Sequence, residues 1–339
     1  MAEHEFTPEN SPDADKTRDR TIPNRQPRRR SRSLLANLFI LTGLVLMGLF
    51  GGQLIGMLFA QLATGVTITQ LPDLLQHPAR YPGAWSALMW IQAGAALGGF
   101  VGASLLFLLG FERRRLADFN AGGSATPPTV WLLVFLLVVL AMPFNGWIYE
   151  MNQRLDLPPV LQGLEDWMKS KESGLEELTK FLTGFSSIGQ LLVGLLVVAV
   201  LPAVGEELLF RGILQNLFRR AFTNVHVAVW LSAAIFSAIH FQFYGFLPRM
   251  LLGALFGYLY VWTRHLGVAM FAHFVNNGFT LVMVYLFRQR VVAYDIEETD
   301  SVPLLAAAFS LGMIALLLWA IYRQSRAENT PADVEGRLE

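Results

Sequence analysis

The chain has 339 residues, of which 53% are hydrophobic and only 15% are charged, whereas about 25% of the residues of a soluble domain are charged. Together with several uncharged apolar runs of about 18 residues or more, this composition excludes an ordinary soluble domain and indicates a polytopic membrane protein. The 26 basic and 26 acidic residues balance, so net charge identifies no partner and no nucleic acid is expected, and the absence of cysteine excludes disulfides, thiolate metal sites and a cysteine nucleophile.

The N-terminal residues 1–33 are polar and rich in proline, arginine and aspartate, so we expect a disordered, basic cytoplasmic segment. Six arginines and no acid lie between Arg20 and Arg32. We interpret them mainly as a topology signal, with binding to anionic lipid as the alternative. The apolar run that follows is too long for the core of a cleavable signal peptide, so no such peptide is expected.

Eight hydrophobic segments are expected to cross the membrane, which makes the fold class an all-α polytopic membrane protein with about eight transmembrane helices and a short amphipathic outer cap. The segments are 34–60, 84–110, 129–149, 187–218, 225–245, 249–263, 266–287 and 303–322. The first three lie in a region spanning 34–154. The last lies, with the loop before it, in 288–322 and is followed by a polar tail, 323–339.

Arginine clusters predict the orientation of these segments. They follow the second, fourth, sixth and eighth segments and comprise Arg113-Arg114-Arg115, Arg219-Arg220, Arg264, and Arg323 with Arg326. If every segment crosses, all of these clusters lie on the same side as the basic N-terminus. Because basic loops stay inside, we expect a cell-membrane protein whose N- and C-termini are both cytoplasmic.

The stretch 155–186 has a different pattern from the spanning segments. Apolar residues recur at helical spacing between charges, namely Leu161, Leu164, Trp167 and Met168, then Leu175, Leu178, Phe181 and Leu182. We expect two short amphipathic helices on the outer interface, broken near Ser173-Gly174. A cap packed on the outer ends of the helices is an equally good interpretation.

Two carboxylates and an arginine stand in the fourth apolar segment, within Gly205-Glu206-Glu207-Leu208-Leu209-Phe210-Arg211-Gly212. Each costs at least about 2.5–3.5 kcal/mol at the centre of a membrane helix. Glu207 and Arg211 have the i,i+4 spacing of a helical ion pair, with the acid first. Glu206 points about 100° away, without a partner in its own helix. Pro202 predicts a kink one turn earlier. The alternative is that these charges only mark the cytoplasmic end of the helix.

Two of the six histidines lie inside apolar runs. His240 lies one helical turn after Phe236, and His273 lies one turn before Asn277, so each pair shares a helix face. A lone membrane histidine often makes only a helix–helix hydrogen bond. Two of them on different helices, with an unpaired glutamate on a third, indicate a common site. The other four histidines are in polar segments or flank the membrane segments.

This set of residues can activate a water molecule in two ways. In one, Glu206, His240 and His273 bind a divalent metal such as zinc, with one position left for water. In the other, which is metal-free, Glu206 is oriented by His240 and takes the proton of the water, while His273 and Asn277 stabilise the oxyanion. Other intramembrane chemistries lack their residues, since no His-Glu-x-x-His, Gly-x-Ser-Gly or Gly-x-Gly-Asp sequence occurs.

The motifs Glu206-Glu207-x-x-x-Arg211, Phe236-x-x-x-His240 and His273-x-x-x-Asn277 resemble, in order and spacing, those of the CPBP family of CAAX prenyl proteases and bacteriocin-processing enzymes, also called Abi proteins. The resemblance covers about residues 187–287. It implies a hydrolase with Glu206 as catalytic acid/base, completed by His240, His273 and Asn277. Glu207 and Arg211 would be supporting residues. Eukaryotic members of the family cut prenylated C-terminal tripeptides.

The leading hypothesis is therefore an intramembrane endopeptidase, a protease of the CAAX type that is a metalloprotease if a metal is bound. Its partners would be a peptide or membrane-associated protein substrate and the lipid bilayer. A cation or proton carrier is a second hypothesis, because intramembrane glutamate and histidine also serve as relay residues. A non-catalytic membrane scaffold is a third.

Overall fold

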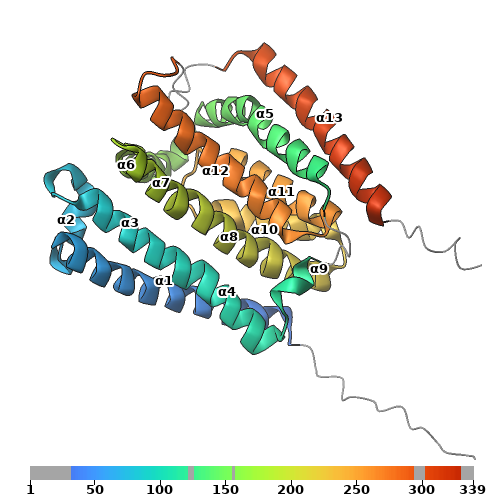
Figure 1. Cartoon of the computed structure of the whole chain (residues 1–339), viewed down its shortest axis with the longest axis horizontal. Helices are drawn as coiled ribbons and strands as arrows, with labels where there is room; N and C mark the ends of the chain where they lie inside the picture. The colour runs from blue at the N-terminus through green and yellow to red at the C-terminus, as the bar shows by residue number, and fades with distance from the viewer. Residues whose placement is uncertain (1–31, 121–125, 155–156, 294–301, 330–339) are drawn as a thin grey trace, which may run out of the picture. The chain divides into compact units, whose positions relative to one another are not determined.

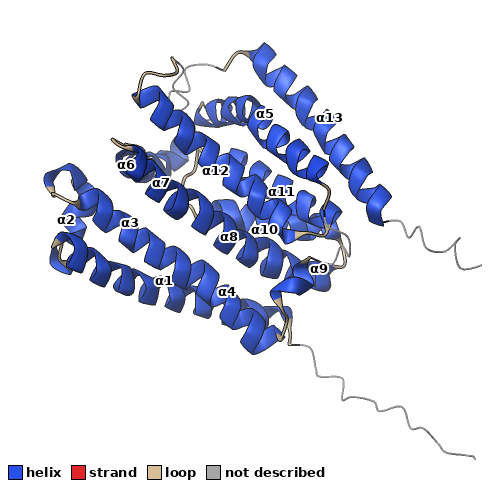
Figure 2. Ribbon diagram, viewed as in Figure 1, coloured by secondary structure: helices blue, strands red, loops and turns tan. Residues whose placement is uncertain are grey.

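The computed structural model describes residues 32–120, 126–154, 157–293 and 302–329, and Leu34–Glu339 forms one compact unit by its internal contacts. Within the described ranges the chain is almost entirely helical and has no β-strand (Figure 2). The predicted all-α class is confirmed. Most of the basic N-terminal segment, the acidic loop at 297–300 and the end of the C-terminal tail lie outside the described residues.

The helices follow one another as Figure 1 shows. The α-helices are α1 (Leu34–Thr64), α2 (Leu71–Gln76), α3 (Ala84–Ala95), α4 (Ala103–Leu106), α5 (Pro128–Gln153), α6 (Gln162–Thr183), α7 (Ile188–Gly194), α8 (Leu201–Glu207), α9 (Gln215–Phe222), α10 (Val225–Ala238), α11 (Phe246–Thr263), α12 (Leu266–Arg288) and α13 (Leu304–Asn329). Wider π-type turns are η3 (Ala96–Gly102), η4 (Phe107–Glu112), η7 (Leu195–Val200) and η8 (Leu208–Leu214), and short 3-10 turns are η1 (Ile68–Gln70), η2 (Pro78–Arg80), η5 (Leu116–Phe119) and η6 (Pro159–Leu161).

Among the residues that the structure describes, six helices are long and apolar enough to cross a membrane, so the chain is a multi-pass membrane protein. They span Leu34–Thr64, Ala84–Glu112, Pro128–Gln153, Ile188–Phe222, Leu266–Arg288 and Leu304–Arg326. The remaining two predicted segments are also helical, as α10 and α11, but α10 has only 14 residues and α11 has 18 with Arg249 in its first turn. A total of eight spanning helices therefore stays a prediction.

The fifth predicted segment, 225–245, is longer than the helix that the structure contains. α10 ends at Ala238, and Phe241 has a left-handed backbone with φ of 53°. Ser237 Oγ donates to the carbonyl of Phe246 at 2.6 Å, which ties the last turn of α10 to the start of α11. His240 thus lies in the loop between two helices, because the chain turns back before it has crossed a full bilayer.

The predicted break near Ser173-Gly174 is wrong, since α6 continues through both residues. Ser173 Oγ donates to the carbonyl of Ser170 at 3.1 Å, a bond compatible with helical geometry. A glycine within a helix costs only about 1 kcal/mol. α6 also carries the buried carboxylates Glu165 and Glu172, which accept hydrogen bonds from the backbone of Leu157 and Tyr244.

Glycines bring α1 and α3–η3 into backbone contact, and Figure 1 shows the two helices side by side. A Cβ atom added at Gly52 would lie 2.1 Å from the carbonyl oxygen of Gly94, and one at Gly48 would lie 2.2 Å from that of Gly98. No side chain larger than hydrogen fits at these positions. This small-residue packing is typical of helix pairs in membranes, where close van der Waals contact drives association.

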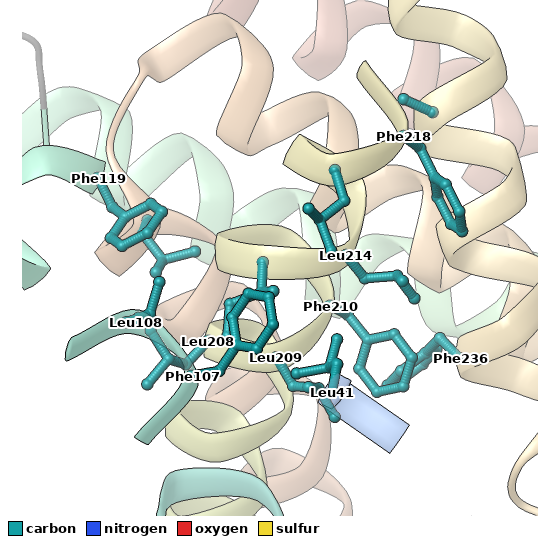
Figure 3. Close-up of a cluster of buried hydrophobic side chains, with 14 residues drawn as sticks. Leu41, Phe107, Leu108, Phe119, Leu208, Leu209, Phe210, Leu214, Phe218 and Phe236 are labelled. Carbon is teal, nitrogen blue, oxygen red and sulfur yellow. The ribbon is translucent and has the colours of Figure 1, made fainter. Parts of the chain in front are cut away.

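The helix that carries the paired carboxylates is central to the compact unit. α8 packs between η3 and α12, and η8 packs on α10 and α11. On its other sides, Leu208, Leu209 and Phe210 enter a buried apolar cluster with Leu41 and Phe107 (Figure 3). The helix is thereby enclosed by elements from both halves of the chain, so its charged residues are removed from lipid.

Candidate active site

Glu207 and Arg211 form the predicted ion pair. Arg211 Nη1 donates to Glu207 Oε1 at 2.6 Å, and the two side chains are 1% and 0% exposed. The second guanidinium nitrogen, Nη2, donates to the carbonyl of Gly253 in α11 at 2.7 Å. Further hydrogen bonds to the members of a buried ion pair offset part of its desolvation cost. The pair therefore joins the continuous helix Ile188–Phe222, which carries Glu206, Glu207 and Arg211 and is called the motif helix below, to α11.

The structure adds a third member to this pair, which the sequence analysis did not predict. His273 Nδ1 lies 2.8 Å from the same carboxylate oxygen, Glu207 Oε1. Because an ionised carboxylate only accepts, Nδ1 carries a proton and donates it. Glu207 thus fixes the tautomer and the ring orientation of His273, and the opposite ring nitrogen, Nε2, is left for chemistry.

Two phenylalanines enclose this cluster. The Phe236 ring lies 4.7 Å from the guanidinium carbon of Arg211 and makes edge contacts with His240 and His273, at centroid distances of 5.2 and 6.0 Å. Phe256 stacks on His273 at 5.4 Å. The aromatic faces attract the cation and hold both imidazoles by packing. The first residue of the Phe236-x-x-x-His240 motif therefore positions three polar side chains.

Glu206 is 8% exposed and forms no hydrogen bond or ion pair with any of the residues that the structure describes. The charges of His273 and Arg249 act on it, as do those of Glu207 and Arg211. The prediction that Glu207 is committed to a partner and Glu206 is not agrees with this arrangement. A buried carboxylate without a partner is a costly feature, which is typical of a functional group.

His240 comes near the cluster from the end of α10. Its Nδ1 lies 2.8 Å from the carbonyl oxygen of Phe236, so Nδ1 donates and Nε2 keeps a lone pair when the ring is neutral. No hydrogen bond joins His240 to Glu206 in the described part of the chain. The predicted orienting contact between them is therefore not formed here, although Phe236 places His240 beside His273.

Asn277 lies one turn beyond His273, as predicted, and is held by the motif helix. Its Nδ2 donates to the carbonyl of Val198 at 3.1 Å. Pro202, four residues after Val198, has no N–H to give to that carbonyl. The Asn277 amide supplies a donor in its place and ties α12 to the helix about two turns before Glu206. One of its two N–H groups is thus occupied, and the other is free for a ligand.

Glu206 and His240 lie at similar depth, counted from the turn between α9 and α10. At 1.5 Å per residue, Glu206 is about 24 Å from Phe222 along its helix, and Ala238, where α10 ends two residues before His240, is about 20 Å from Val225. The two helices meet at that turn and run alongside each other. Because the motif helix continues to Phe222, the two residues reach the same level.

A three-ligand metal site is not assembled in this arrangement. Among the described residues, no group of three or more histidine, cysteine, aspartate or glutamate side chains lies close enough to hold a metal ion. When their rings are neutral, His273 and His240 each have an Nε2 lone pair, which is what a zinc ligand needs. The predicted set of Glu206, His240 and His273 nevertheless does not converge here, so zinc stays a prediction.

Two charged residues near the site were not singled out from the sequence. Arg249 follows the His240 loop, and its charge acts on both Glu206 and His240. Glu172 in α6 accepts hydrogen bonds from the backbone nitrogens of Phe243 and Tyr244 at 3.1 and 3.0 Å. The signal for Arg249 was present in the sequence, because it is a charge in an otherwise apolar segment. Glu172 stands among other exposed-looking charges and gave no such signal.

The segment that carries Glu206, His240, His273 and Asn277 matches a known protein family. Residues 188–279 match the family described as Rce1-like, type II CAAX prenyl endopeptidase Rce1-like. The family resemblance is thereby confirmed for this segment. The match begins at α7 and ends in α12, so it contains the motif helix, the His240 loop and both His273 and Asn277.

A curated relative is the uncharacterized protein YpbD of Bacillus subtilis (strain 168), which is 35% identical over 83 residues. The alignment covers 23% of this chain and 39% of the relative, so the chain spans well under half of the length of the protein that it matches. No solved structure matches the chain.

Proposed function

We propose that this protein is an intramembrane endopeptidase of the cell membrane, with both termini cytoplasmic, which hydrolyses a peptide bond of a membrane-associated peptide or protein. The observation that carries the proposal is Glu206. It is a buried carboxylate without a partner, beside a Glu207 whose charge is balanced by Arg211, within the Rce1-like segment. Such an unpaired acid suits a general base.

The mechanism assigns the first proton transfer to Glu206. Its carboxylate takes a proton from a water molecule, and the water oxygen bonds to the scissile carbonyl carbon as the carbonyl electrons move to the oxygen. The Nε2 lone pair of His240 accepts a hydrogen bond from the second O–H of the water and so orients the water molecule. When the tetrahedral intermediate collapses, the C–N bond breaks, and the proton on Glu206 passes to the leaving amine.

His273 and Asn277 stabilise the oxyanion in this proposal. Asn277 donates through the N–H that is not bonded to Val198. His273 donates from Nε2 when its ring is protonated. Donors held in place before the reaction stabilise the developing charge without a reorganisation cost. No step in this scheme uses a metal.

The test uses purified protein in lipid nanodiscs with a library of lipidated and unlipidated peptides, whose fragments are identified by mass spectrometry. Glu206→Gln and His240→Ala are expected to lower kcat at least about 100-fold, because general acid–base groups contribute 10²–10⁴-fold. His226→Ala is the matched control. His226 is an exposed histidine in the first turn of α10, the helix that precedes His240. Unchanged cleavage by either site variant would refute the assignment.

A further inference from the structure

The guanidinium of Arg249 is held in the first turn of α11, directly after the His240 loop. Its Nη2 donates to Gln242 Oε1. The group also lies over Gly245, since a Cβ atom added there would be 3.3 Å from both Nη1 and Nη2. Nη1 is buried and has no hydrogen-bond partner among the described residues. The Nη2 of Arg249 is thus held by a hydrogen bond, and the N–H groups of Nη1 are available to a ligand.

The loop beneath Arg249 is held from two sides. Glu172 Oε2 accepts from the backbone nitrogens of Phe243 and Tyr244, and Asn152 Nδ2 donates to their carbonyls at 3.2 and 2.7 Å. These four bonds satisfy the polar backbone at the centre of the turn. The position of Arg249 is therefore set by α5 and α6, and it does not depend on a flexible side chain alone.

Two cations and two acids stand at the site, but only one pair is in contact. Arg211 touches Glu207 at 2.6 Å. Arg249 and Glu206 act on each other electrostatically, yet no ion pair within 4.0 Å joins them in the described part of the chain. A guanidinium and a carboxylate that interact electrostatically without direct contact can hold opposite ends of a reacting group, the acid at the water and the cation at a negative oxygen.

The other polar groups supply few hydrogen-bond donors at this place. Nδ1 of His240 and Nδ1 of His273 are already bonded, to the Phe236 carbonyl and to Glu207. Their Nε2 atoms accept when the rings are neutral. Asn277 has one N–H left beside its bond to Val198. A buried N–H of Arg249 is therefore the strongest unoccupied donor near Glu206.

We propose that Arg249 Nη1 binds an anionic oxygen of the peptide substrate beside Glu206. This inference rests on the proposed peptidase function and extends it. The oxygen has two possible sources, the oxyanion of the tetrahedral intermediate and a free carboxylate at the end of the substrate. An oxyanion contact acts on kcat, whereas a carboxylate contact acts on binding of the substrate and thus on KM.

The experiment compares one cleaved peptide in two forms, with a free C-terminal carboxylate and with a C-terminal amide. Wild type, Arg249→Gln, Arg249→Lys and Gly245→Ala are assayed in nanodiscs, with Arg219→Gln as an exposed-arginine control at the far end of the motif helix. Gly245→Ala keeps the charge but displaces the guanidinium by a few tenths of an ångström. It therefore reports on Arg249 even where Arg249→Gln fails to fold.

If the oxyanion is the ligand, Arg249→Gln lowers kcat by about 10²-fold for both peptides, with a smaller loss in Gly245→Ala. If a carboxylate is the ligand, KM rises for the acid and not for the amide, and Arg249→Lys recovers part of the loss. Both outcomes support the proposal. Wild-type kcat and KM for both peptides in Arg249→Gln and Gly245→Ala would overturn it, since a merely structural arginine changes stability alone.

A binding measurement separates this proposal from the peptidase function. Fluorescence anisotropy gives the affinity of both peptides for Glu206→Gln and for Glu206→Gln/Arg249→Gln. If wild type cleaves no peptide, the peptidase proposal fails, and the Arg249 proposal is then judged by binding alone. It stands if the second substitution weakens binding of the acid more than that of the amide, and it fails if the two peptides are bound equally by both variants.

Discussion

His273 Nδ1 and Arg211 Nη1 both donate to one oxygen atom, Glu207 Oε1, at 2.8 and 2.6 Å. The second carboxylate oxygen, Oε2, is buried and has no hydrogen-bond partner within the described ranges. One acid in α8 therefore balances a cation on its own helix and fixes an imidazole on α12. The neighbouring Glu206 takes part in neither of these interactions. Two adjacent glutamates thus have separate roles, one structural and one available for chemistry.

This relationship predicts a large loss of stability in Glu207→Gln. Removing the acid leaves Arg211 buried without its counter-charge, which costs about 3–5 kcal/mol in the free energy of unfolding. Glu112→Gln is the control, because its pair with the half-exposed Arg220 contributes below about 1 kcal/mol. Thermal unfolding in detergent measures both variants. Equal stability of the two would contradict a supporting role for Glu207.

The bond between Asn277 and Val198 predicts coupling between Asn277 and Pro202. Asn277→Ala should lower the free energy of unfolding by about 0.5–2 kcal/mol, the range measured for hydrogen bonds between membrane helices. In a Pro202→Ala background the restored N–H can reach the Val198 carbonyl, so the same substitution should cost less. A double-mutant cycle measures the difference. Identical losses in the two backgrounds would show that Asn277 does not replace the proline's missing donor.

Glu172 is predicted to stabilise the His240 loop from α6. Glu172→Ala leaves two backbone N–H groups without an acceptor, at about 1–3 kcal/mol for each buried group. Glu172→Gln keeps an acceptor oxygen and should lose much less. Glu176→Ala on the same helix is the control, since its exposed pair with Lys180 contributes at most about 0.5 kcal/mol. Hydrogen exchange at residues 241–245 should rise in Glu172→Ala alone.

The glycine contact between α1 and α3 predicts that Gly52→Val and Gly51→Val differ sharply. An added Cβ at Gly52 meets the Gly94 carbonyl oxygen at 2.1 Å, whereas nothing lies within 4 Å of one at Gly51. Overpacking should destabilise Gly52→Val by at least about 1–3 kcal/mol. Unfolding by heat or denaturant in detergent gives the comparison. A similar melting temperature for both variants would mean that the two helices are not in backbone contact.

Metal removal tests the scheme in which Glu206 acts on water directly. The purified protein is analysed for metal content and assayed for peptide cleavage before and after chelation. We expect activity to survive chelation, because the described arrangement does not assemble three ligands. A stoichiometric metal whose removal abolishes cleavage, and whose return restores it, would instead make Glu206, His240 and His273 its ligands.

Local features of the site could be predicted from the sequence. The spacing of Glu207 and Arg211 on one helix is enough to pair them, because residues four apart always lie on the same face. The same rule left Glu206 without a partner in its own helix. Apolar runs likewise predicted the long helices, since a bilayer requires about 20 residues of hydrocarbon length.

Contacts between residues far apart in the chain were decided only by the tertiary structure. His273 lies 66 residues from Glu207, and Glu172 lies 71 residues from Phe243. Which side chain meets which depends on the rotation and depth of each packed helix, and hydropathy does not encode these quantities. The tertiary structure also decides that α10 ends before His240, because the hydrogen bond from Ser237 to Phe246 that closes the turn joins two helices. The sequence by itself thus determined the all-α class, the long apolar helices and the pairing of Glu207 with Arg211, because these depend on local composition and spacing, and packing decided that Glu207 also holds His273 and that α10 ends before His240.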